Sequence, residues 1–389
     1  MKGSFIFLLV FVGFVSFAQT SDNKVSVNLS GFVSTTAFAQ DQEFKFGNGQ
    51  NAAYVNSNYD SGKLIKGFDV RNTRLTLNIK GPDVLKNWKS SAVFEVDLFG
   101  GFNGNSTFAA SQQYLRIRMA YIDLAKGNFK LRLGQAWSPM FGNPTVSLSH
   151  IAFPLGYGSA GFLGWRYPGF QAFYTIAKDS PVNFRIDAAV FSGSWNEPGT
   201  SPDFKNAGNL GFPQMELKFN AFWKNSNVYL VGHYDKKDLA AIDKDEKSEL
   251  DGLALEMGGK TKIGGFMMQG NIYTGKNIGH QFGSITQLPA IKQDLSSYGG
   301  WFQLGYDLTQ HWSIFGFVGF EHVDKDQALK AFPSPAVPRT RHQLLNFMLK
   351  YTAEPVSFGF EFMNSKLTLG DNDQEWTGNQ FALSGLYKF

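Results

Sequence analysis

Apolar and polar residues alternate one by one along most of this chain, and the last segment, residues 377–389, shows the pattern most clearly. One face of that segment carries large apolar residues and a glycine: Phe381, Leu383, Gly385, Tyr387 and Phe389. The other face is small or polar apart from one large exception, Leu386: Gln380, Ala382, Ser384, Leu386 and Lys388. A period of two turns one face toward lipid and the other toward a wet interior, which is typical of a transmembrane β-strand.

Similar segments, separated by turn residues, recur along the chain, and sixteen are predicted as strands. They are residues 25–38, 68–79, 88–99, 112–124, 129–137, 166–176, 183–192, 213–222, 228–234, 250–259, 265–273, 296–308, 312–321, 343–351, 356–363 and 377–389. Short and long connections alternate, as do the periplasmic turns and outer loops of membrane barrels. The pattern predicts an all-β fold, a transmembrane antiparallel β-barrel of about sixteen strands, wide enough to hold an aqueous channel.

The beginning of the chain predicts an exported protein. A short basic start precedes an apolar run at residues 5–17, and Ser16, Phe17 and Ala18 form a small-x-small cleavage site. Thirteen apolar residues are too few for a membrane-spanning helix, which needs about twenty. Residues 1–18 are therefore predicted to be a cleaved signal peptide, and residues 19–389 a single barrel domain in the outer membrane of a Gram-negative bacterium.

Composition narrows the class further. The chain has 39 Phe and 42 Gly but no second apolar run of helix-spanning length, which suits strands that show only half their residues to lipid. The absence of Cys excludes disulfides, a thiolate nucleophile and a Cys-ligated metal. A formal charge of +4 without a concentrated basic patch does not suggest a nucleic acid partner.

The connection at residues 139–164 differs from the others because it is strongly apolar and contains three prolines and five glycines. Such a loop would be a liability in water at the cell surface. We expect it to be the inward-folded third loop that packs on the inner wall and narrows the barrel. A contact surface with a neighbouring subunit is the alternative.

Strand alternation assigns charged side chains to the barrel interior. The predicted pore-lining basic residues are Arg74, Arg116, Arg118, Lys130, Arg132 and Arg185. The predicted pore-lining acidic residues are Glu95, Asp97, Asp187 and Glu216, with Glu256 and Glu361 as further candidates. The same parity places Tyr121 on the lipid face, and Arg71 too unless a bulge intervenes.

Two hypotheses follow for these charges. Rings of arginine or lysine in a channel favour anions, and the planar guanidinium suits bidentate capture of carboxylates. Alternatively, Glu95, Asp97 and Asp187 pair the arginines in a structural ladder that leaves little net field.

Several apparent motifs carry no function in this context. Gly156, Gly158 and Gly161 have dinucleotide-fingerprint spacing but fall in the expected inward loop, and Asn277 stands where a P-loop needs Ser or Thr. His150 lies near Ser147 and Ser149, yet sequence spacing does not establish a catalytic triad.

Three acidic stretches, residues 243–246, 324–326 and 371–375, fall in predicted outer loops. Clustered carboxylates there suit hard cations such as calcium or a bridge to lipopolysaccharide, while solvated loop tips are the simpler interpretation.

A family resemblance rests on two stretches, Asp69 to Leu75, and Arg116 to Ala120 followed by Gly134 to Ser138. Here the chain resembles the DcaP-like porins, mainly across residues 68–141. The resemblance implies a sixteen-stranded homotrimeric channel with an inward third loop and a basic eyelet that favours small anions such as dicarboxylates. It also implies that arginines within the matching stretch belong to the eyelet.

Members can carry a helical extension before the barrel, whereas here the first strand begins within about six residues of the predicted cleavage site. The short leader is similar to those of the Bacteroidetes.

Together these features predict an outer-membrane porin, passive and without cofactor or metal, in contact with outer-membrane lipid and lipopolysaccharide. It would pass small hydrophilic solutes and prefer anions such as small carboxylates. An accessory barrel that binds a protein partner is the alternative, and a barrel enzyme is a further one, although the sequence offers no convincing acid, base and nucleophile set.

Overall fold

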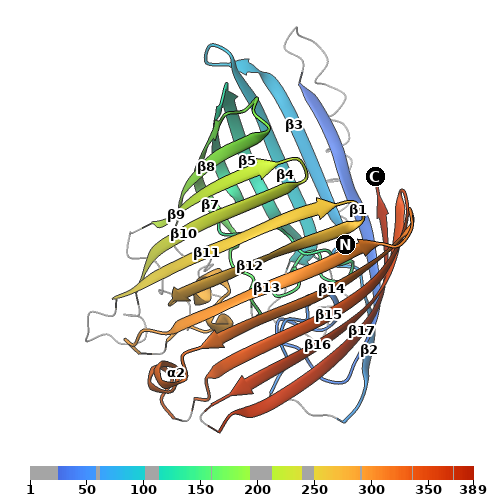
Figure 1. Cartoon of the computed structure of the whole chain (residues 1–389), viewed down its shortest axis with the longest axis vertical. Coiled ribbons are helices and arrows are strands. Elements are labelled where there is room, and N and C mark those ends of the chain that lie inside the picture. The colour runs from blue at the N-terminus through green and yellow to red at the C-terminus, as the bar shows by residue number, and fades with distance from the viewer. Residues whose placement is uncertain are drawn as a thin grey trace, which may run out of the picture.

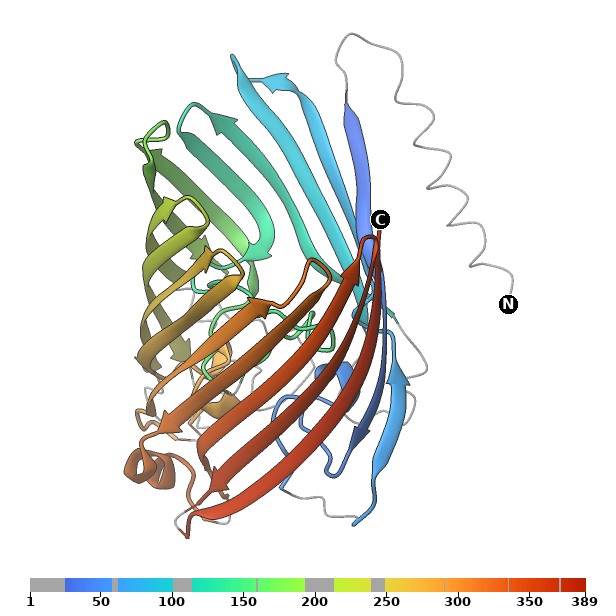
Figure 2. The same ribbon diagram turned by 45° about the vertical axis from the view of Figure 1, so that its right-hand side comes forward.

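The computed structural model describes residues 25–57, 62–100, 114–158, 160–192, 213–238, 249–289, 291–334, 336–370 and 372–389. The predicted signal peptide and the acidic stretch at 243–246 lie outside these residues. The described chain forms one closed antiparallel barrel with strongly tilted strands (Figures 1 and 2).

Every one of the sixteen predicted strand segments corresponds to a strand. The strands are β1 (Ser26–Gln40), β2 (Ile65–Asp69), β3 (Arg74–Val84), β4 (Trp88–Gly100), β5 (Tyr114–Lys126), β6 (Phe129–Trp137), β7 (Arg166–Ile176), β8 (Val182–Phe191), β9 (Gln214–Trp223), β10 (Ser226–Asp238), β11 (Glu249–Ile263), β12 (Phe266–Lys276), β13 (Ser296–Asp307), β14 (Trp312–Val323), β15 (Arg339–Ala353), β16 (Val356–Leu369) and β17 (Gln374–Lys388). From β3 onward each strand pairs with the next, and β1 pairs with β17, so the barrel has no open edge.

Two of the seventeen strands share one position in the wall. Both β2 and β3 pair with β1, β2 at Thr36 to Gln40 and β3 at Ser26 to Phe32. They are the two halves of one strand, interrupted at residues 70–73. The interruption breaks the parity used for Arg71, which points inward and bonds Asp69 rather than facing lipid.

The alternation of the last strand is confirmed. Phe381, Leu383 and Tyr387 are exposed on the outer face, while Gln380 and Ser384 are buried on the inner one. Leu386, the apolar exception, is buried against Leu148 of the inward loop (residues 139–164) together with lumen-facing Met267, Phe315 and Met348. The exception therefore marks the place where the loop rests on the wall.

A bulge in β5 overturns the sequence assignment of the residues that follow it, Tyr121 among them. Glu95 pairs with Met119 while the next residue, Val96, pairs with Ile117, so the register skips one position at Arg118. Parity reverses beyond the bulge. Tyr121 consequently lies inside, with the Cζ of Arg132 3.7 Å from its ring centroid, and not on the lipid face.

Three long connections fold into the barrel, and the sequence predicted only one of them. Besides the inward loop, the described residues of the connections at 41–64 and 277–295 place buried side chains in the lumen. These two connections contain η1 (Gly49–Asn51), η3 (Gly279–Gln281) and η4 (Ser284–Thr286). Phe44, Leu155, Phe162 and Phe282 from the three loops meet Trp301 of the wall in one apolar cluster. The loops thus cover the inner face of β13–β16.

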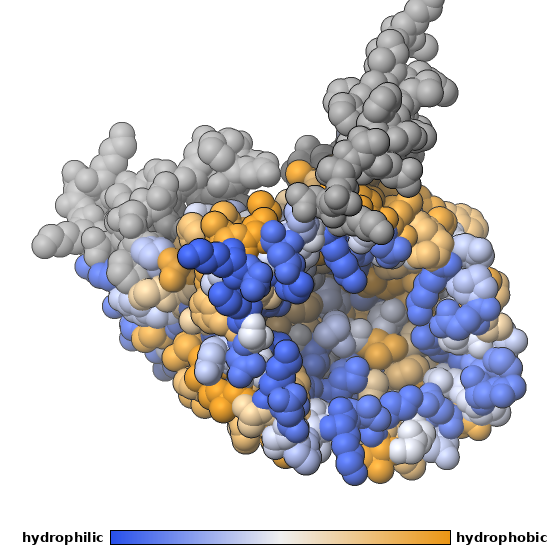
Figure 3. All heavy atoms as spheres, turned by 90° about the horizontal axis from the view of Figure 1, so that it is seen from above, coloured by the Kyte–Doolittle hydropathy of each residue, from blue (hydrophilic) through white to orange (hydrophobic). Residues whose placement is uncertain are grey.

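The remaining interior is open. Figure 3, which looks down on the upper end of Figure 1, shows a hollow whose rim is mostly hydrophilic. The α-helix α2 (Lys325–Ala331) lies at the opposite end, after β14, where Asp324 caps it by accepting from the Gln327 N–H. Among the described residues, no helix is long and apolar enough to cross a membrane.

Candidate pore lining

The inward loop is held to the far wall by a buried carboxylate. Glu361 of β16 accepts hydrogen bonds from the backbone N–H groups of Leu148 (2.8 Å) and Ser149 (2.7 Å) and from the Ser147 hydroxyl (2.6 Å). Gln303 of β13 adds a reciprocal pair with the backbone of Val146, both bonds 2.8 Å long. Glu361, a further acidic candidate of the sequence, is therefore a loop anchor.

A second anchor lies at the start of the loop. Glu216, predicted to line the pore, accepts from the Met140 N–H at 2.7 Å and contacts His233 at 3.1 Å. Lys218 donates to the Pro139 carbonyl at 2.8 Å. Glu216 faces inward as expected, but it is buried beneath the loop.

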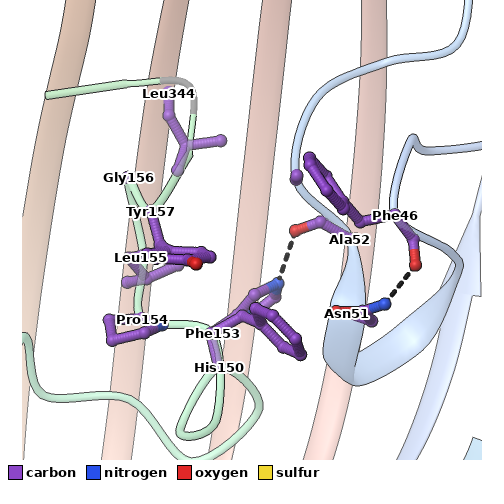
Figure 4. Close-up of a pocket in the computed structure, with 11 residues that line it drawn as sticks. Phe46, Asn51, Ala52, His150, Phe153, Pro154, Leu155, Gly156, Tyr157 and Leu344 are labelled. Carbon is purple, nitrogen blue, oxygen red and sulfur yellow. Dashed lines mark hydrogen bonds between the residues drawn. The ribbon is translucent and has the colours of Figure 1, made fainter. Parts of the chain in front are cut away.

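The inward loop also binds the loop at residues 41–64. The Nε2 of His150 lies 3.0 Å from the Ala52 carbonyl (Figure 4). Its Nδ1 lies 2.8 Å from the Ser149 hydroxyl. A cavity of about 10 Å³, room for about one water molecule, lies beside this contact. Its lining includes Phe46, Asn51, Phe153 and Tyr157.

The same loop contacts explain why Ser147, Ser149 and His150 lie close together. Ser149 and His150 are buried, and Ser147 gives its hydrogen bond to Glu361. Both ring nitrogens of His150 are occupied by protein groups. These residues join two loops and present no accessible nucleophile.

On the wall opposite Glu361, from β2 to β8, the charged residues form two groups. The first is the five-arginine cluster: Arg71, Arg74, Arg116, Arg118 and Arg166, with Asp69, Glu95 and Asp97. Arg116 pairs with Asp97 through two bonds of 3.0 and 2.6 Å, and Arg118 bridges Glu95 (2.7 Å) and Asp97 (2.9 Å). The ladder hypothesis thus describes these pairs well.

The pairs differ in access to the lumen. The Arg118 side chain is 1% exposed, whereas that of Arg116 is 22% exposed. The Cζ of Arg116 also lies 4.8 Å from the ring centroid of Phe153, on the inward loop. The cluster therefore contacts the edge of the inward loop.

Arg166, which strand alternation did not single out, leaves the arginines of this cluster more numerous than its carboxylates. Only 3% exposed, it has its Cζ 3.9 Å from the ring centroid of Trp165 and 4.8 Å from that of Trp137. Its Nε and Nη1 have no hydrogen-bond partner, and no carboxylate among the described residues lies within ion-pair distance. Five arginines therefore share three carboxylates. The signal that could have found it is its place directly after Trp165, at the first residue of β7.

The second group lies nearer the short turns and contains Lys130, Arg132 and Arg185. Arg132 pairs with Asp123 through bonds of 2.7 and 2.8 Å, and Arg185 pairs with Asp187 through bonds of 2.6 and 2.8 Å. Lys130 lies 3.7 Å from the same Asp123 carboxylate. Asp123 was missed because the β5 bulge changes its parity.

Comparison with known proteins finds the same fold but no close relative. No family model matches the chain, and no curated protein matches it. The outer-membrane channel DcaP of Acinetobacter baumannii is 18% identical, covering 94% of this chain and 97% of that one, with a TM-score of 0.71. OmpF of Salmonella typhi, in complex with daunomycin, is 10% identical over 93% and 97%, with a TM-score of 0.58. In-vitro-folded OmpT of Vibrio cholerae, in a trimer form, is 13% identical over 94% and 99%, with a TM-score of 0.55. The chain thus has the barrel fold of outer-membrane porins.

Proposed function

We propose that this chain is a passive porin of a Gram-negative outer membrane that passes small hydrophilic solutes and prefers anions, small carboxylates in particular. The route runs along the charged wall of β3 to β8, because loops cover the inner face of β13 to β16. The exposed sides of Arg74 and Arg116 line that route. A signal peptide at residues 1–18, a homotrimeric state and contact with lipopolysaccharide belong to the same proposal.

The observation that carries the anion preference is the unpaired charge of Arg166. Ion pairs cancel most of the wall's charge, but five arginines against three carboxylates leave an excess of two positive charges in the five-arginine cluster. In a lumen walled by low-dielectric protein this excess raises the local concentration of anions. Guanidinium groups further favour carboxylates, which they can bind through two parallel hydrogen bonds.

The test is a planar-bilayer measurement on the refolded mature chain, with the reversal potential read across a KCl gradient. We expect ohmic steps with an anion-favouring reversal potential, and a shift toward zero in Arg166→Met, which keeps much of the side-chain volume. Arg341→Met, at an exposed position of β15, is the control and should leave the reversal potential unchanged.

A folded barrel that does not conduct would contradict the proposal and favour an accessory barrel with a protein partner. A barrel enzyme is disfavoured because the Ser and His residues of the inward loop are engaged in loop contacts. A cation-favouring reversal potential would contradict the anion preference alone.

A further inference from the structure

Three cationic side chains of the β5 to β8 wall converge on one aromatic ring. The Lys130 Nζ lies 4.2 Å from the ring centroid of Phe173, and the Cζ atoms of Arg132 and Arg185 lie 5.4 and 5.6 Å from it. Strand pairing fixes this arrangement, since Lys130 pairs with Phe173 and Phe173 pairs with Asp187 across β6, β7 and β8. We call Lys130, Arg132, Arg185, Phe173, Asp123 and Asp187 the Phe173 cluster.

The carboxylates of the Phe173 cluster do not balance its cations. Asp123 is engaged by Arg132 through both oxygens and Asp187 by Arg185 in the same way, which leaves Lys130 with only a 3.7 Å contact to Asp123. Three cations against two carboxylates give one excess positive charge. Lys130 and Arg185, on either side of Phe173, are also the most exposed, at 35% and 36%.

The Phe173 cluster is separate from the five-arginine cluster. Asp123 pairs with Ser91 of β4, while Asp97, which binds Arg116 and Arg118, lies six residues further along the same strand. At about 3.3 Å per residue the two clusters are about 20 Å apart along the wall. Neighbouring short turns, such as Lys126 to Phe129 between β5 and β6, place the Phe173 cluster toward the hydrophilic mouth in Figure 3.

We propose that the Phe173 cluster is a second anion-binding site, which holds a small carboxylate between Lys130 and Arg185 at the short-turn mouth. The ligand class rests on the proposed function. Each cation can donate to a carboxylate oxygen without breaking the bidentate pairs, because guanidinium and ammonium groups carry further N–H donors. Two sites in series suit conduction, since each can bind an anion weakly enough for it to move on.

Binding of ¹³C-acetate to the refolded full-length barrel in detergent micelles, followed by NMR line broadening, tests the site independently of conduction. Losing both donors in Lys130→Met/Arg185→Met should weaken acetate binding at the Phe173 cluster by at least about tenfold, since the loss of even one charge-assisted hydrogen bond accounts for about that factor. Lys130→Arg/Arg185→Lys keeps both charges and should retain most of the binding. Heat-modifiable migration on gels checks that each variant is folded.

Lys224→Met removes one charge from an exposed short turn between β9 and β10 and is the matched control, expected to bind acetate as the wild type does. Equal loss in Lys224→Met would overturn the site in favour of general charge at the mouth, and unchanged binding in the double variant would overturn it outright. A conducting, anion-selective wild type whose double variant binds acetate normally would leave the proposed function standing without the second site. A silent wild type with a double variant that binds weakly would support the site and contradict the porin.

Discussion

Glu361 of β16 accepts a 2.7 Å hydrogen bond from the backbone N–H of Ser149, at the middle of the inward loop. The same carboxylate accepts from the Leu148 N–H and the Ser147 hydroxyl, so one side chain satisfies three donors of a segment that has no sheet partner. Glu361 is therefore the main anchor of the middle of the loop, beside the Gln303 contact at Val146 and the Glu216 contact at Met140.

Replacing that residue should release the loop. In Glu361→Ala three buried donors lose their acceptor, at a cost of about 1–3 kcal/mol each where water does not replace it. We expect a lower thermal midpoint and noisier, larger single-channel steps. Glu354→Ala, on the exposed turn of the same hairpin, should change neither, and a Glu361→Ala channel identical to the wild type would show that other contacts hold the loop.

Arg116 and Arg118 should respond differently to the same substitution. Arg118→Met leaves Glu95 and Asp97 short of a buried partner and should destabilise the barrel by about 3–5 kcal/mol. Arg116→Met should cost less stability, since Asp97 keeps Arg118 and the Arg116 side chain is partly exposed, but it should reduce anion preference. Urea midpoints in lipid vesicles and reversal potentials measure the two effects. Equal urea midpoints for Arg116→Met and Arg118→Met would contradict the predicted difference in stability.

Acid should loosen the contact between the two loops. Burial lowers the pKa of His150 below its ordinary value of 6.5, although the charges of Glu361 and Asp69 and the Ala52 carbonyl oppose that shift. Since the folded pKa is the lower one, the contribution of His150 to stability is complete above about pH 6.5 and is lost as pH falls below that value. Thermal midpoints from pH 7.5 to 5.5 should therefore fall more steeply for the wild type than for His150→Gln. Parallel slopes would exclude His150 as the cause.

Leu386 should matter more than its lipid-facing neighbour Leu383. Leu386→Ala would leave a cavity under Leu148 and cost about 2–5 kcal/mol. Leu383→Ala, at a side chain 62% exposed on the outer face, should cost less because lipid can fill the space. Urea midpoints in vesicles compare the stability of the two variants. A larger loss of stability in Leu383→Ala than in Leu386→Ala would contradict the contact between Leu386 and the inward loop.

The wall could be predicted from sequence because a period of two is imposed by the pleat at every residue. That reasoning failed where the pleat is interrupted, at Tyr121 beyond the β5 bulge and at Arg71 in the break between β2 and β3. It also missed the other two inward loops, whose apolar residues are spread among polar ones. Arg116 has a carboxylate partner and Arg166 has none within ion-pair distance among the described residues. That difference depends on distances between side chains of different strands, which parity alone does not supply.

The pairing of β1 with β17 has a consequence for the order of assembly. Thr36 and Ser384 join their hydroxyl groups at 2.9 Å although 348 residues separate them. The ring cannot close until the final strand is in place, so a chain that lacks it has two open edges, whose unpaired backbone groups lipid cannot satisfy. Insertion and closure should therefore occur as one late, cooperative event, and loss of the last strand should abolish assembly instead of merely weakening the barrel.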